Sequence, residues 1–438
     1  MSSLLQCGQI LHGSNTQTAY EIETFLGAGT QGEVYQAKTN GQHVALKCYF
    51  PQYIKTDPNC QQRLEKAISK GNPDSNFLWP IELVFTDDNQ IFGYVMPLRP
   101  SHYKSIVDLM KRRIDPGFRE LITACLGLVE SFLHLHAKGF CYRDINFNNI
   151  FLNPQTGDIL ICDNDNVDVN GVPGAINGTP RFMAPELVRG DAAPCTESDL
   201  FSVSVLLFYM LMLHHPLEGK KEADIRCFDQ AAMNKLYGTE PVFIFDPSDN
   251  SNYPVKGLHD NALEYWPLYP LFIRDLFTRA FTTGIQDAQH GRVRENEWRH
   301  ALIRLRDSMI YCSCGAENFY DSEQLKQGQQ QACWSCKQPL SYPPRLRIEN
   351  TIVMLNHDTH LYPHHIDKTR RFDFSQAVAK VTRHPNDPNR WGLQNLTDKS
   401  WTITLTDNTL KTVEPQRSVN LSAGIRINFG NLQAEIRV

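Results

Sequence analysis

Hydrophobic and polar positions alternate along residues 18–60, and glycines interrupt the pattern. Alternation with a period of two predicts β-strands joined by tight turns. Residues 118–138 instead carry apolar side chains three or four positions apart, up to Gly139. That spacing gathers them on one face and predicts an amphipathic helix. Residues 201–213 are almost wholly apolar but too few to span a bilayer, which favours a buried core helix.

The pattern changes again towards the C-terminus. Residues 196–307 are mostly helical in pattern, apart from an irregular stretch rich in Pro, Asn and Asp at 239–257. A cysteine-bearing segment follows and extends to about residue 342. The remaining residues return to short alternating strands, as in 401–407, 424–430 and 432–438. This order predicts a multidomain α+β chain.

Composition excludes several classes of protein. The 438 residues carry a formal net charge of −5, which provides no electrostatic footprint for nucleic acid or an anionic membrane. The N-terminal residues lack the basic and apolar regions of a signal peptide. Eight of the 12 cysteines are scattered over residues 7–227, as in a reducing compartment. We therefore expect a cytoplasmic protein with neither a nucleic-acid nor a membrane partner.

Three glycines, Gly27, Gly29 and Gly32, have G-x-G-x-x-G spacing. Such a loop lets the backbone approach phosphates closely. A dinucleotide-binding turn has the same spacing but opens a helix, whereas Val34 here continues a strand. Lys47, on the following strand, can reach the α- and β-phosphates of a nucleotide. The alternative is a glycine-rich hairpin with a surface lysine.

The stretch 141–152 carries Asp144 and Asn149 five positions apart. Phosphoryl transfer needs a carboxylate that orients the attacking hydroxyl and accepts its proton, and a nearby amide oxygen that binds a metal ion. Asp163 ends an apolar strand nineteen residues after Asp144 and is the predicted carboxylate ligand of that metal. Asp165 is a rival ligand, but the strand register favours Asp163.

The order and spacing of these motifs resemble the protein kinases. The resemblance implies a bilobal kinase fold over residues 18–307, ATP and Mg²⁺ (or Mn²⁺) as cofactors, and protein substrates. It implies that Asp144 is the catalytic base and that Lys47 pairs with a helix carboxylate, for which we predict Glu65. A surface role for Glu65 is the alternative. The residues expected to bind the nucleotide and its metal are Gly27, Gly29, Gly32, Val34, Ala45, Lys47, Met96, Leu98, Asn149 and Asp163.

The large lobe carries further matches. Glu186 ends an Ala-Pro-Glu tripeptide, and Asp199 begins the long apolar helix. We predict Arg292 as the buried partner of Glu186. Thr179 precedes Pro180 and is expected to shape the substrate-facing loop.

The sequence also departs from the kinase pattern. Tyr142 replaces the usual histidine, which has a packing role. Asn146 stands where serine/threonine kinases usually carry a lysine, and stabilisation of transition-state charge is worth roughly 2–4 kcal/mol. Asn164 and Asp165 replace Phe-Gly, which affects regulation more than metal binding. Slow turnover is therefore expected.

Four cysteines form two close pairs, separated by 18 residues. Two close pairs of cysteines favour a tetrahedral zinc site over four unrelated thiols. A small domain with little hydrophobic core needs a bound metal for stability. We predict a structural Zn²⁺ ribbon over residues 310–342, with no open position for catalysis. The predicted ligands are Cys312, Cys314, Cys333 and Cys336.

Residues 343–438 carry short alternating strands, the segment GLQNLT (392–397) before Trp401, and the closing pattern L-x-x-G-x-x-I-x-F-G (421–430). These features resemble the forkhead-associated β-sandwiches, which bind phosphothreonine. His365 and Asn395 fall near the expected binding positions. Because phosphate recognition normally needs an arginine fork, both are more simply explained as ordinary loop residues. The module is then expected to dock a partner without recognising phosphate.

The whole order of segments resembles the bacterial kinases of tellurite-resistance-associated phosphorylation triads (TerY-P type). That resemblance implies a stress-signalling role and two partners, a metal-dependent protein phosphatase and a von Willebrand A-type protein. Two functions follow from the sequence. The first is an active serine/threonine kinase, and the second is a pseudokinase scaffold that assembles those partners.

Overall fold

The computed structural model describes residues 3–86, 91–170, 178–326, 328, 330–384 and 386–438. Its contacts divide the chain into two compact units. One comprises residues 1–266 and 275–298, and the other residues 267–274 and 299–438. Helices α10 (Leu271–Phe281) and α12 (Glu295–Asp307) contribute residues to both units. None of the described helices combines the length and apolar character needed to cross a bilayer.

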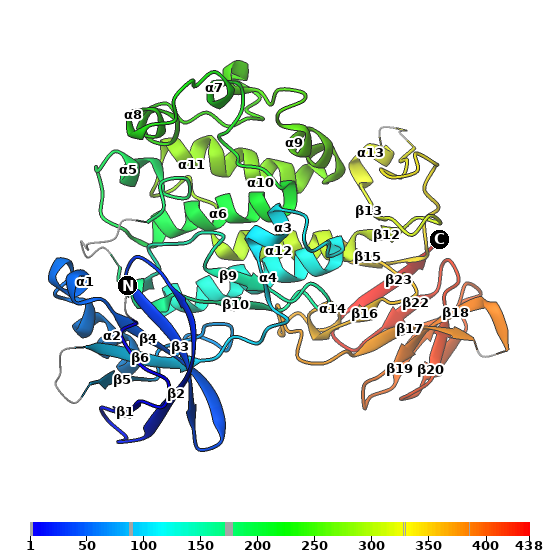
Figure 1. Cartoon of the computed structure of the whole chain (residues 1–438). Helices are drawn as coiled ribbons and strands as arrows, with labels where there is room; N and C mark the ends of the chain where they lie inside the picture. The colour runs from blue at the N-terminus through cyan, green and yellow to red at the C-terminus, as the bar shows by residue number, and fades with distance from the viewer. Residues whose placement is uncertain (1–2, 87–90, 171–177, 327, 329, 385) are drawn as a thin grey trace. The chain divides into compact units, whose positions relative to one another are not determined.

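Six strands close into a barrel at the start of the first unit (Figure 1). Burial alternates over the first four residues of β2, where Tyr20 and Ile22 point inward, as the sequence pattern predicts. The first strand was not anticipated, and it closes the barrel by pairing with both β2 and β5. The strands are β1 (Ile10–Gly13), β2 (Ala19–Ala28), β3 (Gly32–Thr39), β4 (Gln42–Tyr49), β5 (Glu82–Phe85) and β6 (Phe92–Pro97).

Two helices follow β4, so the expectation of strands as far as residue 60 was wrong beyond Tyr49. These helices are α1 (Pro51–Thr56) and α2 (Cys60–Lys70). Helix α1 begins with Pro51, a residue that suits the first helical turn because that turn needs no N–H. Helix α2 buries one face, which carries Cys60, Arg63, Leu64 and Ala67.

Two long helices form the centre of the larger lobe (Figure 1). Helix α4 (Phe118–Ala137) confirms the predicted amphipathic helix, and α6 (Thr196–Met212) contains the apolar run. Residues of α6 are buried on all sides from Ser198 to Met212, because neighbouring elements cover the helix all round. The other helical segments of this unit are α3 (Ile106–Met110), α5 (Pro185–Val188), α7 (Lys220–Ala223), α8 (Gln230–Met233), η2 (Asn234–Thr239), η3 (Asn250–Asn252), α9 (Asp260–Tyr265) and α11 (Thr283–Gln286).

Short strand pairs bring together two loops that are distant in sequence. Strand β9 (Ile150–Leu152) pairs antiparallel with β10 (Ile159–Ile161), and Ile150 lies opposite Ile161. This register places Asn149 beside Cys162, whose N–H donates to the Asn149 carbonyl over 2.8 Å. The loops after β8 and β10 therefore meet. The neighbouring elements are β7 (Lys104–Ser105), β8 (Phe140–Cys141), η1 (Asn164–Asn166) and β11 (Asp168–Val169).

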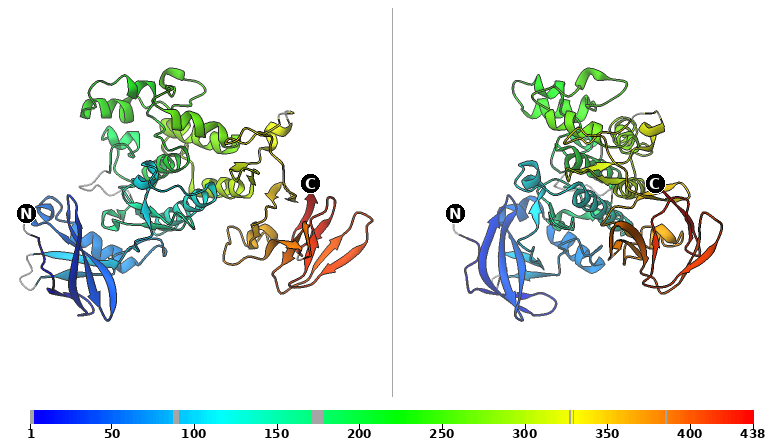
Figure 2. Two further views of the ribbon diagram at one scale, coloured as in Figure 1. Left: turned by 45° about the vertical axis from the view of Figure 1, so that its right-hand side comes forward. Right: turned by 90° about the vertical axis from the view of Figure 1, so that its right-hand side faces the viewer.

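In the second unit a short hairpin follows α12, and two antiparallel sheets follow the hairpin (Figure 2). The six-stranded sheet has the order β15-β14-β23-β22-β19-β20, and the four-stranded sheet has the order β16-β17-β18-β21. Apolar residues of both sheets, including Leu346, Leu393 and Trp401, form one core. Three predicted strands are confirmed as β19, β22 and β23.

The elements of this unit, beyond its parts of α10 and α12, are η4 (Trp266–Leu268), β12 (Met309–Tyr311), β13 (Glu317–Phe319), α13 (Ser322–Lys326), β14 (Arg345–Ile348), β15 (Thr351–Met354), β16 (His360–Leu361), α14 (Pro363–Ile366), β17 (Ala379–His384), β18 (Asp387–Asn395), β19 (Trp401–Thr404), β20 (Leu410–Val413), β21 (Ser418–Asn420), β22 (Arg426–Asn428) and β23 (Gln433–Arg437).

Candidate active site

Lys47 lies at the centre of a buried polar cluster on β4. Its side chain is almost wholly enclosed, and the residue is 5% exposed. The ammonium group donates to Asp163 Oδ1 at 2.6 Å, to Asp165 Oδ2 at 2.8 Å and to Gln31 Oε1 at 2.6 Å. Burial alone lowers the pKa of Lys47, but the carboxylates of Asp165 and Asp163 outweigh it and raise the pKa above its usual value. Lys47 is therefore a fixed cation.

Asp163 and Asp165 differ in their access to solvent. The Asp163 side chain is 37% exposed, whereas that of Asp165 is 1% exposed. Asp163 has φ +57°, a left-handed conformation that Asp tolerates better than most residues and that turns the chain sharply after β10. Burial raises the pKa of the Asp165 carboxyl, but the ion pair with Lys47 outweighs burial and holds this pKa below its usual value. Lys47 is therefore bound by one partly exposed carboxylate and one enclosed carboxylate.

Glu65 is not near Lys47, so the predicted pair is not formed. Its side chain is exposed on α2 and accepts from Gln61 Nε2 at 2.9 Å. Glu65 directly follows the buried Leu64, and one residue turns a helix by about 100°. The carboxylate consequently points to solvent. Asp165 is the residue that the structure brings to Lys47 in its place.

The loop after β8 holds Asp144 by several contacts. Asp144 Oδ1 accepts from the Thr179 hydroxyl at 2.8 Å. The Asp144 carbonyl accepts from the side-chain amides of Asn149, at 2.9 Å, and Asn146, at 3.1 Å. Asn146 also accepts from the Asn148 N–H at 2.8 Å, so both ends of its amide bind loop backbone. Asn146 thus shapes this loop.

Buried groups support this loop from behind. Asp199 accepts from the backbone N–H groups of Tyr142, at 2.6 Å, and Arg143, at 3.2 Å. His136 lies between two carboxylates. Its Nε2 is 3.2 Å from Asp199 Oδ2, and its Nδ1 is 2.5 Å from Glu295 Oε1. The Tyr142 ring packs against Phe132 and its hydroxyl donates to the Cys162 carbonyl, which agrees with the packing role expected of Tyr142.

The ion pair predicted between Glu186 and Arg292 is confirmed. Arg292 is buried, and its guanidinium donates to both Glu186 oxygens at 2.8 Å. Such a two-oxygen contact fixes the end of the segment that begins after Asp163. Residues 171–177 of that segment lie outside the described residues.

The three glycines of the loop have different surroundings. A Cβ added at Gly32 would lie 1.9 Å from the Cys48 carbonyl oxygen, so β4 requires glycine there. Gly27 and Gly29 have nothing within 4 Å of such a Cβ. Gln31, between them and Gly32 in sequence, donates to Asn166 Oδ1 at 3.1 Å and accepts from Lys47. The loop tip is therefore tied to the Asp163 segment.

The apolar residues predicted to bind a nucleotide lie in one cluster. Ala45 is paired with Met96 across β4 and β6, and Val34 and Leu98 pack against the same group. The cluster adjoins Lys47, because Val34 lies opposite Lys47 in the β3–β4 pairing. Its surface can contact a flat aromatic base while the lysine contacts phosphates.

The polar residues fit a divalent cation with oxygen ligands. Asp163 presents a partly exposed carboxylate, and the Asn149 amide oxygen remains for a cation because its Nδ2 donates to the Asp144 carbonyl. Carboxylate and amide oxygens are the ligands that Mg²⁺ prefers. Asp165 is enclosed by Lys47 and Tyr49, which places it behind this pair.

Four cysteines of the second unit lie together. The Sγ atoms of Cys312 and Cys336 are 3.6 Å apart, and those of Cys314 and Cys333 are 3.7 Å apart. All four ligand atoms lie within 4.8 Å of one another. Thiolates bound to one zinc ion at about 2.3 Å stand about 3.8 Å apart, so the group fits tetrahedral Zn²⁺.

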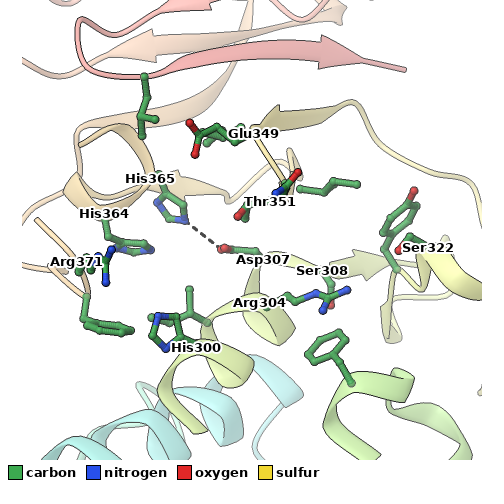
Figure 3. Close-up of a pocket in the computed structure, with 18 of the residues that line it drawn as sticks. His300, Arg304, Asp307, Ser308, Ser322, Glu349, Thr351, His364, His365 and Arg371 are labelled. Atoms are coloured by element: carbon green, nitrogen blue, oxygen red, sulfur yellow. Dashed lines mark hydrogen bonds and ion pairs between the residues drawn. The ribbon is translucent and has the colours of Figure 1, made fainter. Parts of the chain in front are cut away.

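The second unit also contains a cavity of about 810 Å³ (Figure 3). One face of α12 lines it with His300, Arg304 and Asp307, whose spacing of three to four positions puts them on one side of the helix. His365 lies opposite and contacts Asp307 at 3.2 Å, and both side chains are buried. His364 Nε2 and Asp307 Oδ2 are buried, with no partner among the described residues.

Sequence reasoning missed several site residues. Asp165 was considered only as a metal ligand, Gln31 was not considered, and the histidine at position 136 was read only as part of a helix. Burial of Asp165 follows from the packing of η1 against α2, which no local pattern reveals. His136 is the one whose position carried a signal, because the negative end of the helix dipole favours a protonated histidine in the last turn.

Comparison with known proteins gives one family match. The model described as "Protein kinase domain" matches residues 20–267, more than half of the chain. Mouse "Protein kinase C delta type" is 29% identical over 230 residues, which are 50% of this chain and 33% of that protein. "Serine/threonine-protein kinase PknD" of Chlamydia abortus is 28% identical over 243 residues, 46% of this chain and 25% of that protein. The matches thus cover about a third or less of these relatives.

Proposed function

Because the chain belongs to the protein kinase domain family, we propose that it is an ATP-dependent protein serine/threonine kinase. The observation that carries this proposal is the convergence of Lys47, Asp144, Asn149 and Asp163 in one site. These are the groups that phosphoryl transfer requires: a phosphate-binding cation, a base and two metal ligands. The name of the Chlamydia abortus relative supports the choice of serine and threonine as acceptors.

The proposed reaction begins with a substrate hydroxyl near Asp144. The carboxylate orients the hydroxyl and takes its proton as the hydroxyl oxygen forms a bond to the γ-phosphorus of ATP. The bond between that phosphorus and the bridging oxygen breaks, and ADP leaves. Thr179 holds one Asp144 oxygen at 2.8 Å, so the other oxygen is left for the substrate.

Lys47 binds the α- and β-phosphates, and the loop of Gly27, Gly29 and Gly32 covers them. Asn149 and Asp163 would hold Mg²⁺ or Mn²⁺, which neutralises charge on the phosphates when bound. Val34, Ala45, Met96 and Leu98 surround the base. Glu65 has no part in this assignment, because its side chain points to solvent.

Turnover is expected to be slow. A lysine in place of Asn146 would put a positive charge beside the γ-phosphate, and the Asn146 amide is instead bound to loop backbone. Loss of such a group costs about 10²–10³ in kcat. Kinases commonly turn over at roughly 1–100 s⁻¹, so we propose a rate of about 0.001–1 s⁻¹.

The C-terminal residues are proposed to form two modules, at residues 310–342 and 343–438. The first is a ribbon that holds Zn²⁺ through Cys312, Cys314, Cys333 and Cys336. The four sulfur atoms lie within 4.8 Å of one another, a spacing that supports binding of one tetrahedral zinc ion.

The second module is proposed to be a forkhead-associated-like β-sandwich that docks partners. Its two sheets share one apolar core, which supports that architecture. His365 and Asn395 serve the fold. His365 pairs with Asp307, and the buried Asn395 donates to the carbonyls of Lys399 and Val413. Docking without phosphate recognition by these two residues is therefore the better proposal.

The biological setting is proposed from the order of the segments. A kinase domain, a cysteine cluster and a β module in this order suit a bacterial stress-signalling system of the tellurite-resistance type, in the cytoplasm. Its proposed partners are a metal-dependent protein phosphatase, a von Willebrand A-type protein and protein substrates. The acidic balance of the chain supports the absence of a nucleic-acid partner.

A scaffold without catalysis is the alternative, and one observation favours it. Gln31 binds both Lys47 and Asn166, which holds the glycine loop close to the cleft where phosphates would lie. A protein that keeps this contact permanently would bind partners but not transfer phosphate.

Two measurements on three proteins distinguish these functions. The wild type, Asp144→Asn and Asp163→Asn are assayed for Mg²⁺-dependent ATP binding by calorimetry and for phosphate transfer to a generic protein substrate. A kinase is expected to lose transfer but keep binding in Asp144→Asn, and to lose metal-dependent binding in Asp163→Asn. If the wild type binds Mg-ATP but transfers no more phosphate than Asp144→Asn, the protein is a scaffold.

A further inference from the structure

We propose that Asp165 is the positioning residue for Lys47, in the role that protein kinases commonly assign to a glutamate of the helix after the lysine strand. The inference rests on the proposed kinase function and deepens it. It locates the anchor of the nucleotide-binding lysine in the segment that carries the metal ligand, rather than in helix α2.

Helix α2 does not supply a carboxylate to Lys47. Its sequence CQQRLEKAISK contains a single acidic residue, Glu65, which is exposed and bound to Gln61. The face that α2 turns inward carries Cys60, Leu64 and Ala67, together with Arg63, which is paired with Asp57. The helix has therefore no anionic side chain on its inward face.

Asp165 has the features of such an anchor. It is 2% exposed, and its Oδ2 accepts from Lys47 at 2.8 Å and from the Tyr49 hydroxyl. Tyr49 lies two residues after Lys47 on β4, so both donors to Asp165 belong to one strand. Segment η1, which carries Asp165, packs against α2. Asp165 thus occupies the space between that helix and the lysine.

The two partners of Lys47 suit different tasks. Asp163 faces the cleft with a 37% exposed side chain and can turn to a metal ion. Asp165 lies behind, at 1% side-chain exposure, where a divalent cation with its water ligands has no room. When Lys47 leaves Asp163 for phosphate oxygens, Asp165 can continue to hold it and keep its charge compensated. Asp163 and Asp165 therefore divide metal binding and lysine positioning.

This arrangement couples two functions of one short segment. Asp163 and Asp165 are separated by one residue, so a movement of η1 displaces the metal ligand and the lysine anchor together. A displacement of α2 that leaves η1 in place breaks neither ion pair. We expect control of this enzyme to act on residues 163–170 rather than on the orientation of α2.

The test compares Asp165→Asn with a matched variant, Asp57→Asn. Asp57 is 4% exposed and forms a buried ion pair with Arg63 in the same lobe, but it does not contact Lys47. Both changes remove one charge from a buried pair and are expected to lower the melting temperature. Only Asp165→Asn is expected to lower kcat/KM for ATP, by about 10- to 100-fold, below the melting temperature of each protein. Glu65→Gln is expected to keep wild-type values.

A conservative variant separates the charge from the shape of the side chain. Asp165→Glu keeps the carboxylate, so it is expected to be more active than Asp165→Asn even if it is no more stable. Equal loss of kcat/KM in Asp165→Asn and Asp57→Asn, or a larger loss in Glu65→Gln, would overturn the inference. If Asp165→Asn does not fold, Asp165→Ser replaces it as the variant without the carboxylate, and an equal loss of kcat/KM for ATP in Asp165→Ser and Asp57→Asn would overturn the inference.

The proposed function and this inference fail in distinguishable ways. Affinity for Mg-ATP is measured alongside transfer, so the role of Asp165 can be read from binding alone. A wild type without transfer activity contradicts the kinase. Wild-type affinity in Asp165→Asn, together with active wild-type protein, contradicts only the assignment of Asp165.

Discussion

Thr179 donates a hydrogen bond to the carboxylate that we propose as the catalytic base. It donates to Asp144 Oδ1 at 2.8 Å, in the loop that ends at Glu186. We predict that Thr179→Ala lowers kcat about 3- to 10-fold, as expected for one lost hydrogen bond, with little change in KM for ATP. Steady-state kinetics check this, and Thr179→Ser is the control that keeps the hydroxyl. Equal losses in both variants would contradict this role.

His136 makes stability depend on pH. Burial lowers the pKa of this histidine, but hydrogen bonds to Asp199 and Glu295 outweigh it and raise the pKa from 6.5 to about 9. The imidazolium therefore stabilises the fold fully below about pH 6.5, and this contribution is lost as the pH rises through 9. The shift corresponds to roughly 3 kcal/mol at most.

Denaturant unfolding of the wild type and His136→Gln at several pH values tests this prediction. The difference in unfolding free energy between the two proteins is expected to be largest near pH 6 and to shrink as the pH approaches 9.5. A difference that stays constant from pH 6 to 9.5 would show that His136 is not protonated in the folded protein.

At the residue scale, local spacing predicted which residues lie together better than it predicted their individual contacts. The positions of Lys47, Asp144 and Asn149 follow from local spacing, and the structure brings them to one site. Glu65 was mistaken because the inward face of a short helix depends on how it packs. Asp165 was undervalued for the same reason, since only tertiary packing shows that it is enclosed.

At the scale of elements, the glycine loop contains one glycine that the fold requires, Gly32, and one that it does not require, Gly27. A methyl group at Gly32 would collide with the Cys48 carbonyl of β4, whereas one at Gly27 meets nothing within 4 Å. We predict that Gly32→Ala destabilises the fold by about 1–3 kcal/mol. Gly27→Ala is expected to keep stability within about 0.5 kcal/mol but to raise KM for ATP. Melting curves together with ATP kinetics separate the two, and matching melting temperatures would contradict this account.

Strong periodicity predicted elements well. Apolar side chains three or four positions apart in residues 118–138 predicted the bounds of α4 to within one residue. The apolar run predicted most of α6. The helices after Tyr49 were partly misread as strand because a six-residue helix such as α1 has too few turns to show a period. Strand β1 was missed because its four residues are stabilised by pairing with β2 and β5.

At the scale of the whole molecule, the cysteine cluster is expected to staple the second unit. We predict one Zn²⁺ per chain in protein purified without chelator, and a lower melting temperature once a strong chelator has removed it. Elemental analysis and calorimetry check both parts. Cys333→Ser is expected to lose the metal, whereas Cys227→Ser, at an exposed cysteine outside the cluster, is not. Metal content far below one per chain would remove the ribbon assignment.

Strand-rich, helical and again strand-rich stretches follow one another along the chain, as the change in sequence pattern predicts. The division of the chain into two compact units was not predictable, because α10 and α12 contribute to both. No pattern in the sequence of α12 shows that its C-terminal turns line a cavity with His365. Contacts of that kind depend on the fold of residues far away in the chain.

The most direct test of the central claim is the initial rate of γ-phosphate transfer from Mg-ATP by the purified wild type, with Asp144→Asn as the baseline. For an active kinase that has Asn146 where others have a lysine, we predict a rate of about 0.001–1 s⁻¹, well above that baseline. A wild-type rate equal to that of Asp144→Asn, in protein that binds Mg-ATP, would contradict the claim and identify the chain as a scaffold.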